Sequence, residues 1–225
     1  MMKKFAIIAA AGSGSRMNSP TPKQFLLLAG RPVLWYTIST FLDAYPDLEI
    51  ILVLPADHIP EGKVLVKSFD SPSRIQLVSG GDTRFHSVKK GLEFIIDPSI
   101  VFVHDGVRCL VTKTLIHRCY EKTLLSGNAV PAISSVDSMR LEKDGGNRPL
   151  DRTKVKIIQT PQTFRSELLK KAFEQEYQES FTDEASVVER LDVKINLVEG
   201  EELNMKITHP SDFAAAEKII VTMFG

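Results

Sequence analysis

The chain has 225 residues with 28 basic and 28 acidic side chains, so its formal net charge is zero and its pI is about 7.0. This balance excludes the bulk electrostatics typical of nucleic-acid or membrane-surface partners. An apolar content of 43% can fill one core, so we expect a single domain over residues 1–225. No apolar segment approaches the roughly 20 residues of a membrane span.

The cysteine content and the N-terminal residues both favour a cytoplasmic protein. Cys109 and Cys119 lack the spacing of a metal site, which favours two reduced core thiols in a reducing compartment. The N-terminal Met1-Met2-Lys3-Lys4, followed by apolar residues to Ala11, superficially resembles a secretion signal. Because the apolar part is short and runs into a loop with glycine and arginine, we interpret it as a first strand.

Short apolar runs alternate with amphipathic stretches from residue 5 to residue 133. The predicted strands are residues 5–10, 49–54, 75–79, 100–103 and 129–133, and the predicted helices are residues 33–44, 57–68 and 112–125. A further helix follows residues 80–87 and buries Val88, Leu92, Ile95 and Ile96. This alternation predicts an α/β fold with one doubly wound, mostly parallel sheet.

The alternation breaks at residues 134–158, which are rich in charge and contain the turn Gly145-Gly146-Asn147. We predict a β-hairpin there. A hairpin is marginally stable by itself, so it is either a flexible lid or an arm that packs on a second subunit, and we favour the arm. Later elements are helices at residues 166–177 and from Pro210, a short helix with Thr182 as its N-cap, and strands at 194–198 and 204–208.

The loop after the first strand carries the strongest chemical signal. Gly12 and Gly14 let the backbone approach a ligand, and Arg16 and Lys23 supply two cations in the same loop. A polyphosphate needs such amide donors and fixed positive charge, so the loop favours phosphoryl or nucleotidyl transfer. The alternative is a glycine-rich turn with two solvated cations. Met17 excludes the dinucleotide fingerprint, and neither glycine gives P-loop spacing.

Two further loops follow predicted strands at the same edge of the sheet, where ligands bind in such folds. In residues 80–87, Asp82 either accepts hydrogen bonds from a ligand or caps the helix. Asp105 ends a buried strand, where it helps to hold Mg²⁺ beside a triphosphate, pairs with Arg108 or caps a helix. Strand alternation turns His104 to the opposite face, and we treat it as structural. Lys206 points into the site or lies on an exposed strand.

A series of short motifs runs in one order along nearly the whole chain. They are residues 10–17, 22–24, 80–84 with Ser87, 104–105, 151–152, 160–162, 182–186 and 204–208. Each is weakly specific alone, but the ordered set resembles the 2-C-methyl-D-erythritol 4-phosphate cytidylyltransferases of the non-mevalonate isoprenoid pathway. The resemblance implies a Rossmann-like nucleotidyltransferase that transfers CMP from CTP to the phosphate of 2-C-methyl-D-erythritol 4-phosphate, with Mg²⁺, and releases pyrophosphate.

The resemblance also implies a role for individual residues. The residues implied for CTP binding are Ala10, Ala11, Gly12, Gly14, Gly81, Asp82, Arg84 and Ser87. The implied catalytic cations are Arg16, Lys23 and Lys206. The residues implied for the methylerythritol phosphate are Asp105, Arg108, Ser138, Arg140, Arg152, Thr160 and Thr182, with Asp105 also placing the metal. The 134–158 arm would join a homodimer and reach the neighbour's site.

The chain departs from the family pattern after His104-Asp105. Gly106-Val107-Arg108-Cys109 stands where the family usually has Ala/Ser-Ala-Arg-Pro, and Ser138 stands where threonine is common. One alternative is a ribitol 5-phosphate cytidylyltransferase, which shares the fold and the CTP loops. A non-catalytic nucleotide-binding protein would be expected to have lost some of Arg16, Lys23, Asp105 and Lys206, and all four are present.

Overall fold

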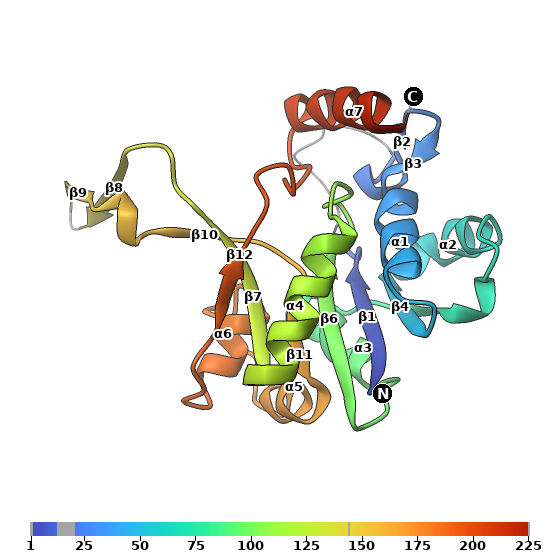
Figure 1. The fold of residues 1–225 in the computed structure, drawn as a ribbon, viewed down its shortest axis with the longest axis horizontal. Coiled ribbons are helices and arrows are strands. Elements are labelled where there is room, and N and C mark those ends of the chain that lie inside the picture. Colours follow the sequence, from blue (N-terminus) through green and yellow to red (C-terminus); the bar gives the residue numbers. More distant parts are fainter. Residues whose placement is uncertain (1, 13–20, 144, 225) are drawn as a thin grey trace.

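The computed structural model describes residues 2–12, 21–143 and 145–224. Its centre is a mixed, mostly parallel eight-stranded sheet with the strand order β10-β7-β11-β6-β1-β4-β5, and β12 pairs with β7 (Figure 1). The strands are β1 (Lys3–Ala9), β4 (Leu48–Leu54), β5 (Ile75–Ser79), β6 (Ser99–Asp105), β7 (Asn128–Ser134), β10 (Lys156–Ile158), β11 (Gln162–Arg165) and β12 (Leu197–Glu199). The predicted α/β class is confirmed.

The parallel strands lie at the centre and towards one edge of this sheet. β1 pairs in parallel with β4 and β6, and β4 pairs in parallel with β5, whereas β11 is antiparallel to both β6 and β7. Every residue of β6 is buried. Helices cover both faces of such strands, which is why their sequences are nearly continuous apolar runs.

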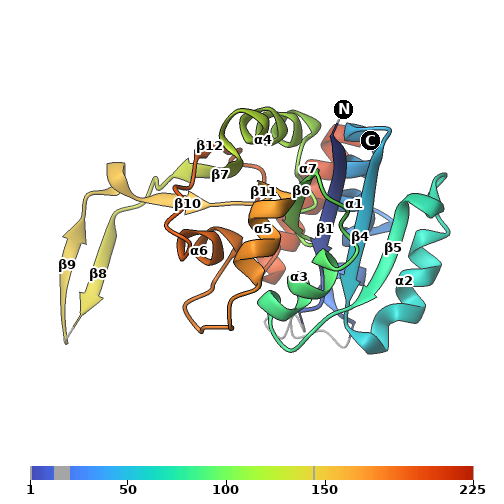
Figure 2. The same ribbon diagram turned by 90° about the horizontal axis from the view of Figure 1, so that it is seen from below.

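Helices cover both faces of the sheet. One face packs against α1 (Val33–Ala44), α2 (Ile59–Val66) and α4 (Lys113–Ser126). The other packs against α3 (Arg84–Leu92), α5 (Ser166–Phe173) and α6 (Glu184–Glu189), and Figure 2 shows α4 and α5 on opposite sides of β11. None of the helices in the described part of the chain is long and apolar enough to cross a membrane.

A smaller cluster lies at the carboxyl end of the central strands. It joins the two-stranded sheet β2 (Leu27–Leu28) and β3 (Arg31–Pro32) to α7 (Pro210–Phe224). Short 3-10 helices complete the described elements: η2 (Lys23–Phe25), η3 (Ala56–His58), η4 (Pro72–Arg74) and η5 (Arg152–Lys154). Ile207, which is fully buried, fastens the segment before α7 to this cluster.

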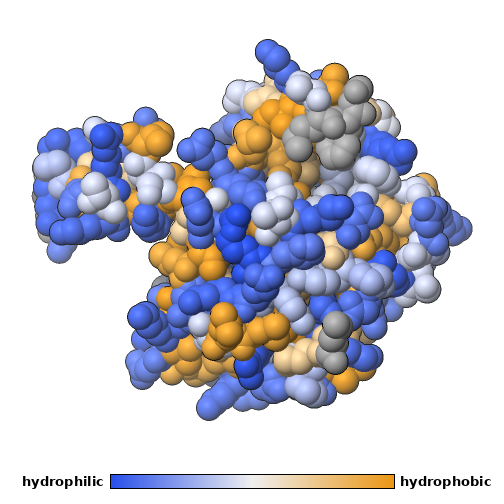
Figure 3. All heavy atoms as spheres, viewed as in Figure 1, coloured by the Kyte–Doolittle hydropathy of each residue, from blue (hydrophilic) through white to orange (hydrophobic). Residues whose placement is uncertain are grey.

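The predicted hairpin exists as β8 (Met139–Lys143) and β9 (Gly146–Leu150), paired antiparallel in a sheet of their own. Figures 1 and 2 show it extending away from the central sheet, and Figure 3 shows a largely hydrophilic projection. Each residue of β8 and β9 is exposed or only half-buried. The hairpin therefore has no core of its own.

Three predicted element boundaries were wrong. α3 ends at Leu92, so Ile96 lies beyond the helix and is 58% exposed. Pro98 follows closely and disfavours helical geometry at the residue before it. α5 ends at Phe173, where the Gln175 side chain donates a hydrogen bond from Nε2 to the Ala172 carbonyl in the last turn. β12 begins three residues later than the predicted strand, at Leu197.

The strand predicted at residues 204–208 is absent from this described segment, which is irregular. Its carbonyl groups are satisfied by side chains instead of a ladder. Lys23 Nζ donates to the Ile207 carbonyl at 2.8 Å, and Arg108 Nη1 donates to the Asn204 carbonyl at 2.8 Å. In this motif Ile207 is a buried anchor, and the preceding Lys206 lines the cleft.

Candidate active site

A cleft of about 320 Å³ lies where β1, β5 and β6 end. It is lined by residues 9–12, 23–24 and 81–84, together with Ser87, Asp105, Val107 and Lys206. The loops that follow three neighbouring strands thus meet at one edge of the sheet, as the strand order requires. The edge predicted from the sequence is the edge that carries the cleft.

Close packing of two loops forms one wall of the cleft. A Cβ atom on Gly80 would lie 2.6 Å from the Cβ of Ala11, so these loops approach only because residue 80 is glycine. Buried Gln24 donates to the Ala10 carbonyl at 2.9 Å and fixes the first loop from behind. Gly14 and Arg16 lie outside the described residues.

The second loop opens α3 with a cap that differs from the prediction. Thr83 is the N-cap and accepts a hydrogen bond from the His86 amide at 3.3 Å. Asp82 is therefore not the cap, and it stays exposed beside the cleft. The Gly81 amide donates to Ser87 Oγ at 3.1 Å, which closes the loop on itself. Gly81, Asp82 and Ser87, which the resemblance implies for CTP binding, thus lie in one turn.

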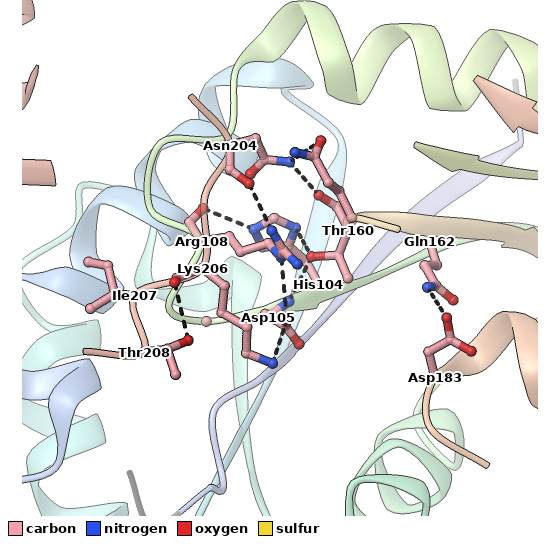
Figure 4. Close-up of polar contacts among 12 residues, drawn as sticks. His104, Asp105, Arg108, Thr160, Gln162, Asp183, Asn204, Lys206, Ile207 and Thr208 are labelled. Carbon is pink, nitrogen blue, oxygen red and sulfur yellow. Dashed lines mark hydrogen bonds and ion pairs between the residues drawn. The ribbon is translucent and has the colours of Figure 1, made fainter. Parts of the chain in front are cut away.

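Asp105 lies at the centre of a charged cluster (Figure 4). Its Oδ1 accepts from Arg84 Nη1 at 2.5 Å, and its Oδ2 lies 3.0 Å from Lys206 Nζ and 3.4 Å from Arg108 Nε. Only 8% of the Asp105 side chain is exposed. Burial opposes ionisation of this carboxyl, but the three cations outweigh it and hold the pKa of Asp105 well below its usual range.

The cluster also places Arg108 and Lys206. Arg108 pairs with Asp105, and the turn that carries it is closed by the Arg108 amide, which donates to the Asp105 carbonyl at 3.0 Å. Cys109, in place of the usual proline, is buried in the apolar cluster beside α7. Lys206 points into the cleft rather than lying on an exposed strand.

His104 points away from the cleft, as strand alternation predicts, and is fully buried. Its Nε2 contacts the Arg108 carbonyl at 3.2 Å, so this nitrogen is the donor, and Nδ1 accepts from the Thr160 hydroxyl at 2.9 Å. Burial lowers the pKa of His104 to about 3, which keeps the ring neutral. Thr160 Oγ1 also accepts from the Asp105 amide at 3.1 Å and so supports the Asp105 backbone.

The other residues implied for the second substrate lie away from the cleft. Ser138, Arg140 and Arg152 are exposed on or beside the arm; Arg140 Nε contacts Asn147 Oδ1, and Arg152 Nη1 donates to the Val136 carbonyl at 2.7 Å. None of the three lines the described part of the cleft. Within this chain, the arm residues and the cleft residues are two separate groups.

The segment at residues 182–186 caps α6 differently from the prediction. The N-cap is Asp183, which accepts from the Ser186 amide at 2.9 Å while Ser186 Oγ accepts from the Asp183 amide at 3.2 Å. Thr182 stands one position earlier and is exposed. Because Asp183 alone serves as the cap, the adjacent Glu184 is not needed for it.

Sequence reasoning assigned no role to Glu184, although it quoted the motif. Glu184 is 1% exposed, and its Oε2 accepts from Arg84 Nη2 at 2.9 Å. Burial raises the pKa of Glu184, and the charge of Arg84 opposes that rise. The sequence offered one signal for this contact: two consecutive acidic residues start a short helix, although one suffices as its cap.

Comparisons with known proteins agree along the whole chain. A family model described as IspD, 2-C-methyl-D-erythritol 4-phosphate cytidylyltransferase, matches residues 4–222. The enzyme of that name from Bacteroides thetaiotaomicron is 43% identical over 219 residues, which are 97% of this chain and 100% of the relative. The one from Porphyromonas gingivalis strain W83 is 41% identical over 222 residues, covering 98% and 99%.

Solved structures give the same answer. The 4-diphosphocytidyl-2C-methyl-D-erythritol synthase from Anaerococcus prevotii superposes with a TM-score of 0.84 and 30% identity, covering 98% of this chain and 99% of that one. The 2-C-methyl-D-erythritol 4-phosphate cytidylyltransferase from Francisella tularensis gives 0.79 and 31%, covering 96% and 99%. The chain therefore belongs to the 2-C-methyl-D-erythritol 4-phosphate cytidylyltransferase family.

Proposed function

We propose that this protein transfers the cytidylyl group of CTP to the phosphate of 2-C-methyl-D-erythritol 4-phosphate in isoprenoid biosynthesis. The observation that carries the proposal is the meeting of Lys23, Lys206 and Asp105 in one cleft at the carboxyl ends of the central strands. Two anionic substrates repel each other, and such a set of fixed charges lowers the cost of bringing them together. Family membership supplies the identity of the substrates.

In this proposal CTP lies across the cleft. Its base is read by the backbone at residues 10–12 and by the turn that contains Gly81, Asp82 and Ser87, and Arg84 closes the wall behind that turn. Lys23 binds the triphosphate, together with Arg16 and the amides near Gly14. Support for Lys23 comes from its burial, 8% exposed at the cleft, and from the hydrogen bond that ties its Nζ to the Ile207 carbonyl.

The reaction is an in-line displacement at the α-phosphorus. A phosphate oxygen of the methylerythritol phosphate forms the new bond, and the bond from the α-phosphorus to the oxygen bridging to the β-phosphorus breaks, releasing pyrophosphate. A phosphate monoester has its second pKa near about 6, so it is already a nucleophile at neutral pH. No general base is needed, which agrees with His104 being buried, neutral and turned away.

Magnesium is part of the proposal, and the donor set fits a shared ion. Among the described residues there is no group of three or more acidic, histidine or cysteine side chains that could hold a metal alone. A single carboxylate suffices when a triphosphate and water complete the coordination of Mg²⁺. Asp105 is the carboxylate in the cleft and would hold it. The ion would neutralise charge on the phosphates.

The second substrate would be shared between two subunits. Asp105 lines the cleft, Arg108 and Thr160 contact Asp105, and Thr182 precedes α6. Ser138, Arg140 and Arg152 would come from the arm of a partner in a homodimer. The arm protrudes and has no core of its own, which supports this arrangement. We expect the enzyme to work in the cytoplasm, in keeping with two buried free cysteines.

Pyrophosphate release tests the function. The purified chain is given CTP and Mg²⁺ with either methylerythritol phosphate or ribitol 5-phosphate, and omission of the polyol phosphate is the blank. Release with methylerythritol phosphate alone is the expected result. Release with ribitol 5-phosphate alone would move the substrate assignment to that alternative and leave the charge assignments standing. Release with neither would contradict the proposed function.

A further inference from the structure

One guanidinium group joins two buried carboxylates that belong to distant parts of the chain. Arg84 Nη1 donates to Asp105 Oδ1, and Arg84 Nη2 donates to Glu184 Oε2, across 21 and 100 positions of sequence. Only 8% of the Asp105 side chain and 2% of the Glu184 side chain is exposed. The bridge therefore fastens the start of α3 to the end of β6 and to the start of α6.

The two carboxylates differ in the cations around them. Asp105 also contacts Lys206 and Arg108, whereas among the described residues Arg84 is the cation that contacts Glu184. Burial would lower the pKa of Arg84, but the charges of Glu184 and Asp105 raise it above its usual range. Arg84 therefore remains charged, and its two end nitrogens are both engaged by protein carboxylates.

This arrangement changes what Arg84 can do for a nucleotide. The planar guanidinium is a rigid fork, and two of its donors are already directed at carboxylates. Glu184 holds one edge of the fork, and the other edge is hydrogen-bonded to Asp105. Glu184 therefore restrains the cation that contacts Asp105.

We propose that Glu184 is a positioning residue: through Arg84 it holds Asp105 in place for the second substrate, and it does not take part in binding CTP. This inference rests on the proposed function. The turn that reads the base has separate supports, namely the Ser87 hydroxyl on the Gly81 amide and Phe85, which stacks on Phe173 at 4.7 Å between ring centroids. Loss of Glu184 leaves those supports in place.

The test compares Glu184→Gln with the matched control Glu189→Gln, which makes the same change at an exposed position of the same helix. Turnover is measured by pyrophosphate release with both substrates and Mg²⁺. CTP affinity is measured by calorimetry without Mg²⁺ and without the second substrate, so that neither proposed ligand of Asp105 is present. We expect the kcat of Glu184→Gln to fall roughly 10- to 100-fold, as misplacement of a reacting group does, with the Kd for CTP within about threefold of wild type. Glu189→Gln should match wild type in both.

A second variant covers the case in which Glu184→Gln fails to fold. Arg84→Lys keeps the positive charge but removes the fork that reaches both carboxylates, so it should show the same loss of kcat. In the double variant the two losses should not multiply, because both changes break the same bridge.

Three results would overturn the inference. The first is a kcat for Glu184→Gln or for Arg84→Lys within about twofold of wild type. The second is a fall in the CTP affinity of Glu184→Gln that matches its fall in kcat. The third is losses that multiply in the double variant. A wild-type chain that turns over while these variants do so equally well would contradict this inference alone. A wild-type chain that releases no pyrophosphate would overturn the proposed function and this inference together.

Discussion

The cleft and the arm of this protein carry similar charges but hold them in opposite ways. At the cleft, Lys23, Arg84 and Asp105 are buried or half-buried and are tied to groups far away in the sequence. On the arm, Arg140 contacts its hairpin neighbour Asn147, and Arg152 contacts the Val136 carbonyl close by. The cleft is preorganised within one chain, whereas these contacts of Arg140 and Arg152 join neighbouring parts of the arm.

This difference indicates which part of the site is complete in a single chain. Charges that are fixed by buried contacts need little reorganisation when a substrate arrives, which suits the stabilisation of a reacting phosphate. Exposed arginines on a hairpin are ordered only when something binds them, because surface ion pairs contribute little. We therefore expect cleft substitutions to act on the chemical step and arm substitutions to act on binding of the second substrate.

The largest effect is expected at Lys23. Lys23→Ala removes a fixed cation from the cleft and should lower kcat by at least about 100-fold, comparable to the loss of one oxyanion donor. The measurement is steady-state pyrophosphate release with both substrates saturating. Lys67→Ala, which removes an exposed lysine at the end of α2, is the control and should behave as wild type. A loss below about tenfold for Lys23→Ala would contradict the assignment.

A smaller effect is expected on the arm. Arg152→Ala should raise the KM for the methylerythritol phosphate about tenfold, the value of one hydrogen bond to a charged group, with the Kd for CTP unchanged. Lys154→Ala, whose side chain is 84% exposed nearby, is the control and should leave both constants as they are. A rise in the Kd for CTP equal to the rise in KM would contradict the separation of arm and cleft.

Mixing the two variants distinguishes an arm from a lid. If the arm reaches the site of a partner, mixed dimers of Lys23→Ala and Arg152→Ala contain one intact site. With methylerythritol phosphate well below its KM, activity should then recover to about a quarter of wild type when equal amounts of the two subunits exchange freely. If the hairpin closes over its own cleft, every site keeps one defect, and the mixture shows only the average of the separate variants.

The smallest effect comes from a pair of glycines with the same backbone geometry. Gly127 ends α4 with φ 82°, Gly145 turns the hairpin with φ 77°, and a Cβ atom at either would meet nothing within 4 Å. Alanine costs about 1 kcal/mol in this conformation. Gly127→Ala should lower the free energy of global unfolding in urea by that amount. Gly145→Ala should change it by less than about 0.5 kcal/mol, because the arm opens separately. Equal losses of unfolding free energy in the two variants would show that the arm unfolds together with the core.

The sequence was most informative where structure is local. Continuous apolar runs predicted the central strands, because strands covered on both faces have little use for polar residues. Glycine and charge directly after three of these runs predicted loops at one edge, and the cleft lies there. The hairpin between residues 134 and 158 was also predicted, from its turn residues and its dense charge.

Element ends and polar partners were predicted less well. Asp183 rather than Thr182 caps α6, and Thr83 rather than Asp82 caps α3, because several neighbouring residues can serve as a cap and the packed helix selects one. Ile96 has the spacing of a buried residue but lies beyond the end of its helix. These errors concern one to four positions, and they leave the order of the helices concerned unchanged.

By itself, then, the sequence determined the alternation of strands and helices over residues 5–133, the family motifs and the edge at which the chemistry lies, since these depend on neighbouring residues and on a repeating pattern. Only the tertiary structure decided that Lys206 enters the cleft from an irregular segment and that Arg84 joins Asp105 to Glu184. Such contacts span up to about 100 positions. They form because a buried charge must find an opposite charge in space, and no local pattern records which one it finds.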